Sequence, residues 1–101
     1  MAFERLVSSL TRDNLWLYIL KMLNEQPTYP LDLKKKFQHR FHFSPATITF
    51  YVVLYKLRRE GLVETFQDDR RKLYRCTGKG LKILQEGIHF IDRTSSLLKP
   101  V

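Results

Sequence analysis

The chain has 101 residues, of which 44% are apolar and 28% are charged, and its formal net charge is +8. This is the composition of an ordinary globular protein, and a chain of this length forms one domain at most. No apolar run is long enough to cross a bilayer and the first residues lack the pattern of a signal peptide, so we expect a cytoplasmic protein. A single cysteine, Cys76, excludes an internal disulfide.

The positive charge is concentrated in one part of the chain. Residues 34–82 contain 13 Lys or Arg against four Asp or Glu, whereas the remaining residues have a net charge of −1. Such a local excess predicts a surface for a polyanion, with nucleic acid as the first candidate. A membrane surface is disfavoured as a partner, because no single amphipathic helix pairs these cations with a large apolar face.

The first 26 residues predict two helices. Residues 1–10 place four apolar side chains at helical spacing, which predicts a short leading helix or docked arm; they are Phe3, Leu6, Val7 and Leu10. A second helix over residues 13–26, capped by Thr11 or Asp13, is apolar almost all the way round. The core of so small a domain covers only one side of such a helix well. We therefore expect a second subunit to cover another side, with Trp16 and Ile19 at the interface.

A third helix is predicted over residues 31–41, after an extended connection bracketed by Pro27 and Pro30. Its apolar residues are expected to face inward and its cations outward. The inward set is Leu31, Leu33, Phe37 and Phe41, and the outward set is Lys34, Lys35, Lys36 and Arg40. Only His42 and Phe43 then separate it from the next helix, which predicts a helix-turn-helix.

The fourth helix is predicted from Ser44, a good N-cap, with Pro45 at the first helical position and Gly61 as the stop. Helical spacing predicts an inward face of Phe50, Val53, Leu54 and Leu57. The opposite face carries Pro45, Ile48, Thr49, Val52, Tyr55, Lys56 and Arg59. Apolar and hydroxyl side chains of this kind suit thymine methyl groups and base edges in the major groove of DNA. The alternative is that the outward residues pack against a neighbouring element.

After Gly61 the pattern changes to a period of two. Residues 62–67 and 72–77 predict two short strands joined by the charged tip DDRR, so we expect a β-hairpin. Its tip and return strand carry Arg70, Arg71, Lys72 and Arg75, more cations than an edge strand needs to resist aggregation. A basic hairpin directly after a recognition helix predicts a wing that contacts phosphates or the minor groove.

The last helix is predicted to begin at the cap Thr77 and to form a dimer seam. Five apolar residues follow a three-and-four spacing that is typical of a close helix pair; they are Leu81, Leu84, Ile88, Ile91 and Leu98. Gly80 and Gly87 stand seven residues apart beside this seam. Glycine is costly inside a helix, so the pair indicates either close approach of another backbone or two weak points.

Three blocks of the sequence together resemble PadR-type winged-helix regulators. They are LNEQPTYPLDLKKKF, TFYVVLYKLRREGLVE and RRKLYRCTGKGLKIL, and the resemblance spans residues 15 to about 90. It implies a homodimeric transcriptional regulator, usually a repressor, of the short form whose single C-terminal helix packs against the partner's N-terminal helix. By position, Thr49 and Tyr51 match the recognition block. Val52, Tyr55 and Cys76 depart from the usual pattern.

Catalytic and metal chemistry is not predicted. The sequence has no phosphate-binding glycine loop and no nucleophile set, so we expect neither an enzyme nor a cofactor. His39 and His42 have a spacing that can bind metal, but no suitable third ligand accompanies them. Cys76 is expected to be a small buried side chain rather than a redox sensor.

We therefore predict a mainly α protein with a small β-hairpin, a winged helix-turn-helix with N- and C-terminal dimerisation helices. Residues 1–101 form one domain, divided into an N-terminal arm (1–12), the winged helix (13–77) and the dimerisation helix (78–101). The expected base contacts are Thr47, Ile48, Thr49, Val52 and Lys56. The expected phosphate contacts are Lys34, Lys35, Lys36, Arg40, Ser44, Tyr51, Arg59, Arg70, Arg71 and Lys72.

Two alternatives remain open at this point. The winged helix could dock an acidic protein partner through its basic surface, because fold does not fix function. A homodimer on double-stranded DNA could also take a small-molecule effector between its subunits, beside Trp16 and the last helix.

Overall fold

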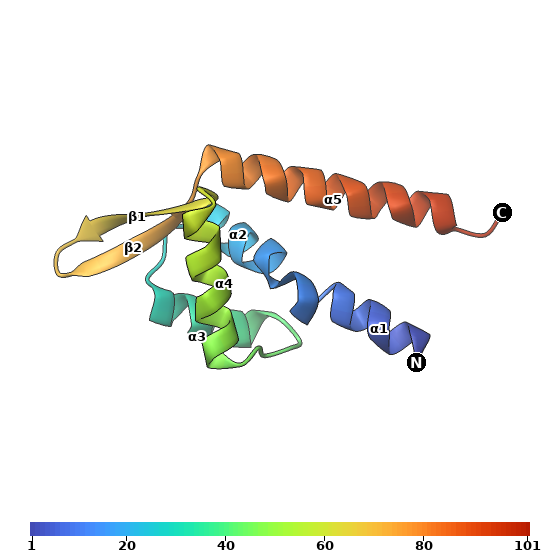
Figure 1. Cartoon of the computed structure of the whole chain (residues 1–101), viewed down its shortest axis with the longest axis horizontal. Helices are drawn as coiled ribbons and strands as arrows, with labels where there is room; N and C mark the ends of the chain where they lie inside the picture. The colour runs from blue at the N-terminus through green and yellow to red at the C-terminus, as the bar shows by residue number, and fades with distance from the viewer.

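A computed structural model describes all 101 residues as five α-helices and one hairpin (Figure 1). The elements are α1 (Ala2–Ser9), the 3-10 turn η1 (Arg12–Asn14), α2 (Leu15–Glu25), α3 (Pro30–Arg40), α4 (Thr47–Arg59), β1 (Val63–Asp68), β2 (Arg71–Cys76) and α5 (Gly78–Leu98). This arrangement confirms the predicted winged helix-turn-helix. The molecule is elongated, 56 × 27 × 21 Å, with both termini at the end opposite to the hairpin (Figure 1). No helix is both long and apolar enough to span a bilayer.

Helix α2 forms the centre of the core. Leu15, Ile19, Leu20 and Leu23 are buried, and α4, α5 and β2 all contact this helix. These elements of the same chain cover much of its apolar surface, whereas Trp16, Leu17 and Tyr18 are only partly buried. The prediction that Ile19 lies at a subunit interface is wrong, because its side chain is 0% exposed within the chain. The predicted caps are also wrong: Asn14 is the N-cap, because η1 takes up the preceding residues.

An aromatic cluster determines the path between α3 and α4. The ring of Phe43 lies 5.0 Å from that of Tyr18 and 5.2 Å from that of Phe37. To bring Phe43 into this cluster the chain runs without regular structure over residues 41–46, and α4 begins at Thr47. The predicted two-residue turn and the predicted start at Ser44 are therefore wrong. Pro45, which was predicted to face outward, is buried.

Gly61 ends α4 as predicted. Its φ of +78° is left-handed, a conformation that glycine adopts without strain. The N–H of Gly61 donates to the carbonyl of Arg58, and the N–H of Leu62 donates to that of Leu57. These two bonds form a Schellman motif, which satisfies the last carbonyls of the helix and turns the chain into the hairpin.

The hairpin pairs β1 with β2 from Val63 opposite Cys76 to Asp68 opposite Arg71. Each strand lies within one residue of its predicted position. Asp69, with a φ of +58°, and Arg70 close the turn. Thr28 adds one residue of a third strand, because its N–H and C=O both bond to the backbone of Tyr74 at 2.9 and 3.0 Å.

Helix α5 begins at the predicted cap, since the Thr77 hydroxyl accepts the N–H of Gly80 at 3.0 Å. Gly80 and Gly87 pack against other parts of the chain. A Cβ on Gly80 would lie 2.2 Å from the Leu62 carbonyl oxygen, and one on Gly87 would lie 3.0 Å from Leu17. The backbone that approaches Gly80 therefore belongs to the same chain, and the neighbours of Gly87 are side chains of α2. Leu84, also predicted for the dimer seam, is largely covered within the chain.

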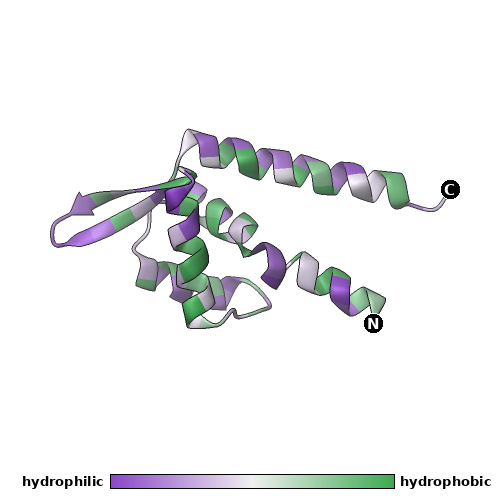
Figure 2. Cartoon of the chain, viewed as in Figure 1, coloured by the Kyte–Doolittle hydropathy of each residue, from purple (hydrophilic) through white to green (hydrophobic).

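Apolar side chains remain uncovered at the far end of the molecule. The predicted N-terminal helix is confirmed as α1, but all its residues are exposed, so it is not docked on its own core. Ile88, Phe90, Leu97 and Leu98 on α5 are exposed as well. Figure 2 shows hydrophobic turns along both helices, which point away from the hairpin.

Candidate nucleic-acid interface

The outward face of α4 is open to solvent. Ile48 is 78% exposed, and Val52 and Tyr55 are also exposed, while Phe50, Leu54 and Leu57 hold the helix on the core. All five predicted base-contact residues are exposed on this helix; they are Thr47, Ile48, Thr49, Val52 and Lys56. No other segment covers Ile48 or Val52. The face offers methyl groups, hydroxyls and an ammonium, which can contact the edges of base pairs in a major groove.

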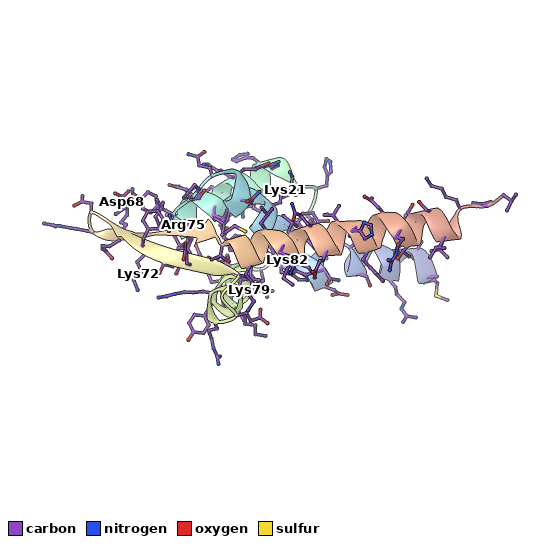
Figure 3. All side chains as sticks on the ribbon, turned by 90° about the horizontal axis from the view of Figure 1, so that it is seen from above. Lys21, Asp68, Lys72, Arg75, Lys79 and Lys82 are labelled. Carbon is purple, nitrogen blue, oxygen red and sulfur yellow. The ribbon has the colours of Figure 1, made fainter.

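The wing divides its cations between two faces, because side chains alternate along a strand. In Figure 3, Lys72 points to the side of the hairpin on which α4 lies, whereas Asp68 and Arg75 point to the other side. Arg75 forms an ion pair with Glu64 at 2.6 Å and lies over the ring of Phe66. Arg71 shares this second face, since it is paired with Asp68 across the strands. Lys72 and the turn residue Arg70 are thus the wing cations without such partners.

Lys34 was predicted to face solvent, but the structure buries it. The residue is 8% exposed, and its Nζ lies 5.7 Å from the centre of the Phe50 ring. Positions 34 and 37 lie on the same side of a helix, so Lys34 points inward with Phe37. Leu31, predicted to face inward, is instead 59% exposed. The inward face of α3 is therefore rotated from Leu31 towards Lys34.

The other cations of α3 differ in their surroundings. Lys35 is exposed, whereas Lys36 and Arg40 line a pocket of about 280 Å³ with Glu25 and Gln26 from the end of α2. Arg40 donates two hydrogen bonds to the Glu25 carboxylate, and these lower the pKa of Glu25 to about 2. The pair stays ionised at neutral pH, so the charge of Arg40 is already compensated.

The remaining predicted phosphate contacts lie near α4. Ser44 is exposed in the segment before the helix, and Tyr51 is half-buried with its ring beside that of Phe50. Arg59 is exposed in the last turn, with its guanidinium 5.9 Å from the Tyr55 ring centre. Tyr51 and Arg59 thus lie on the helix that carries the predicted base contacts, and Ser44 lies three residues before its start.

Two residues near this surface were not predicted from the sequence. Lys79, at the start of α5, donates from Nζ to the carbonyl oxygen of Glu60 at 3.0 Å, and so caps the C-terminal end of α4. Tyr29, in the connection before α3, contacts the wing. Neither has a local sequence signal, because its partner lies many residues away in the chain.

The structure shows neither a cluster of metal ligands nor an activated thiol. The structure contains no group of three or more His, Cys, Asp or Glu that could hold a metal ion. Cys76 is half-buried, and desolvation raises the pKa of its thiol, which disfavours the reactive thiolate at neutral pH.

A family model described as the transcriptional regulator PadR-like family matches residues 19–86. The chain belongs to this family. The match confirms the resemblance carried by the three sequence blocks, and it confirms that the protein is a DNA-binding transcriptional regulator rather than an enzyme. No curated protein matches the sequence.

Solved structures agree with this assignment to the PadR-like family. A PadR family transcriptional regulator from Eggerthella lenta is 28% identical, with a TM-score of 0.74 over 100% of this chain and 99% of that one. A PadR-like regulator from Bacillus cereus is 25% identical, with a TM-score of 0.68 over 92% and 100% of the two chains. A transcriptional regulator from Clostridium thermocellum shares the fold at 20% identity, with a TM-score of 0.77 over 90% and 92%.

Proposed function

We propose that this PadR-like chain is a cytoplasmic repressor that binds a pseudo-palindromic operator as a homodimer. The observation that carries the proposal is the exposed face of α4, where Ile48 and Val52 lie uncovered among hydroxyl and basic side chains. Each subunit would insert α4 into a major groove, with half-sites about one helical turn, roughly 34 Å, apart. A dimer bound in this way represses by excluding the transcription machinery from the operator.

The proposed contacts follow from exposure and charge. Bases would be contacted by Thr47, Ile48, Thr49, Val52 and Lys56. Phosphates would be contacted first by exposed groups of α3, of the segment around α4 and of the wing, namely Lys35, Ser44, Arg59, Arg70 and Lys72, together with the half-buried Tyr51. Lys36, Arg40 and Arg71 would contribute less, because they line the α2 side of α3 or have partners within the chain.

Selection of bound sequences from a random duplex pool tests this function. We expect the selected duplexes to share an inverted repeat, and their affinity to fall steeply between low and physiological salt, because Lys and Arg release counterions from phosphates. Uniformly weak binding without a shared sequence would contradict the proposal and favour a module that docks an acidic protein.

The homodimer is supported by the uncovered apolar surface of α1 and α5. An open groove of about 590 Å³ lies between α2 and α5 and is lined mainly by apolar residues, among them Leu10, Leu17, Ile88 and Ile91. Exposed apolar patches of this kind mark interaction sites in soluble proteins. Of the predicted interface residues on α5, Ile88 and Leu98 are exposed and Leu81 and Ile91 are partly exposed, while Trp16 is half-buried beside Gly87.

Ile88→Arg is expected to convert the dimer into a monomer without unfolding it. Ile88 is 46% exposed in the single chain, so an arginine there stays solvated in the monomer but would be desolvated in the seam. Sedimentation equilibrium measures the change, and Gln85→Arg, at an exposed polar position of the same helix, is the control. An Ile88→Arg protein as dimeric as the control would refute the interface.

We also propose that the chain acts as a single winged-helix domain.

A small-molecule effector, where one acts, is proposed to bind beside α5. A cleft of about 730 Å³ supports this effector site, since Trp16, Ile83 and Lys79 line the cleft together with Val53 and Lys56 of α4. A ligand there would contact the recognition helix directly. It would thereby couple ligand binding to the position of α4.

A further inference from the structure

Tyr29 connects the segment before α3 to the end of the wing. Its hydroxyl donates a hydrogen bond to the Asp68 carboxylate, and the Arg71 guanidinium carbon lies 3.7 Å from the centre of its ring. Asp68 and Arg71 form the last cross-strand pair before the turn. One side chain from outside the hairpin thus contacts both strands at their free end.

A second contact holds the same hairpin closer to its base. Thr28 pairs through its backbone with Tyr74, three residues along β2 from Arg71. Three residues span about 10 Å of a strand, so the residues Thr28 and Tyr29 support the wing at two separated points. An isolated two-stranded hairpin is only marginally stable, so its orientation depends on such external contacts.

These contacts also determine which charges the wing presents. Asp68 places a negative charge near the tip, but the Tyr29 hydroxyl donates to this carboxylate and the cation Arg71 is its partner across the strands. Because side chains alternate, holding Asp68 and Arg71 towards Tyr29 directs Lys72 to the opposite face, the side of α4 (Figure 3). The hydrogen bond to Asp68 raises the pKa of Tyr29 further above neutral pH, in keeping with a protonated phenol that donates to the carboxylate.

We propose that Tyr29 is a positioning residue for DNA binding: by holding Asp68 and Arg71 it fixes the wing so that Lys72 and Arg70 reach phosphates. This inference rests on the proposed function. Tyr29 carries no charge at neutral pH, and its hydroxyl and ring contact Asp68 and Arg71 of the wing, so the effect of this side chain on DNA passes through other residues.

Two variants separate the contributions of Tyr29. Tyr29→Phe keeps the ring beneath Arg71 and loses the hydrogen bond, and we expect an affinity loss of about threefold. Tyr29→Ala loses both contacts, and we expect a loss of about tenfold. Leu31→Ala, at an exposed position two residues further along, is the matched control and should leave affinity unchanged. Amide hydrogen exchange over residues 63–76 of the free protein should be faster in Tyr29→Ala than in the wild type and should be unchanged in Leu31→Ala.

The salt dependence of binding gives the decisive measurement. Removing one phosphate contact lowers the slope of log affinity against log salt by about 1 per subunit. We expect Tyr29→Ala to lower this slope as Lys72→Ala does, although tyrosine has no charge, and we expect the double variant to lose less than the sum of the two. A protein that was merely less stable would keep the slope of the wild type.

The outcomes are distinct. A Tyr29→Ala slope equal to that of the wild type, or fully additive losses with Lys72→Ala, would overturn the positioning role. If the wild-type chain bound no duplex, the proposed function itself would fail, and the exchange rates over the hairpin would still decide whether Tyr29 holds the wing.

Discussion

Ile48→Asp is expected to reduce binding to the selected operator by at least about 100-fold while leaving the free energy of unfolding within about 0.5 kcal/mol of the wild type. Ile48 is 78% exposed in the first turn of α4, so its removal leaves no cavity in the core. A carboxylate at a helix N-terminus is favourable for the fold. In a major groove the same carboxylate meets the phosphate field and replaces an apolar contact to thymine methyl groups.

Fluorescence anisotropy with the selected duplex measures the loss, and urea unfolding followed by circular dichroism measures stability. Leu31→Asp is the matched control, because Leu31 is also exposed and occupies the equivalent position, the second residue of α3. Equal losses in both variants would mean that added negative charge anywhere weakens binding. Full binding by Ile48→Asp would show that α4 does not enter the groove.

Gly80→Ala is expected to destabilise the fold by about 3 kcal/mol, the upper part of the range for overpacking a closed site. The new Cβ would lie 2.2 Å from the Leu62 carbonyl oxygen and 2.8 Å from the Cys76 sulfur. Leu62 cannot easily move, because its N–H completes the turn after α4 and its carbonyl accepts the N–H of Thr77 at 3.1 Å. Relief therefore requires α5 to separate from the junction of α4 and β1.

Urea unfolding measures this change, and Gly78→Ala is the control. Gly78 is the first residue of the same helix, and a Cβ there would meet nothing within 4 Å. We expect Gly78→Ala to be neutral or slightly stabilising, since alanine has the higher helix propensity. Equal stability of the two variants would mean that the contact between Gly80 and Leu62 relaxes without cost.

The predicted start of α4 shows why a good local signal can fail. Ser44 followed by Pro45 has the chemistry of a helix start, yet the helix begins at Thr47. Packing the Phe43 ring against those of Tyr18 and Phe37 requires a segment without helical structure before α4. Tertiary packing of an aromatic ring is worth more than one cap, so it overrides the local preference.

The charged residues of α3 show a second limit. Helical spacing of Leu33 and Phe37 predicted the inward side of this helix, and both are buried. The spacing did not show that Lys34 shares that side, because charge was assumed to place a lysine outward. A long side chain can lay its methylenes along a core while its ammonium lies near an aromatic ring, as Lys34 does over Phe50.

The sequence by itself determined the order of the elements, the exposed face of α4 and the ends marked by Gly61 and Thr77, because periodicity and capping act over a few residues. Only the tertiary structure decided which cations remain free. Arg40 is paired with Glu25 from 15 residues away, and the hydroxyl of Tyr29 reaches Asp68 across 39 residues. Ion pairs and stacking depend on distance in space, and that distance is set by packing of the whole chain.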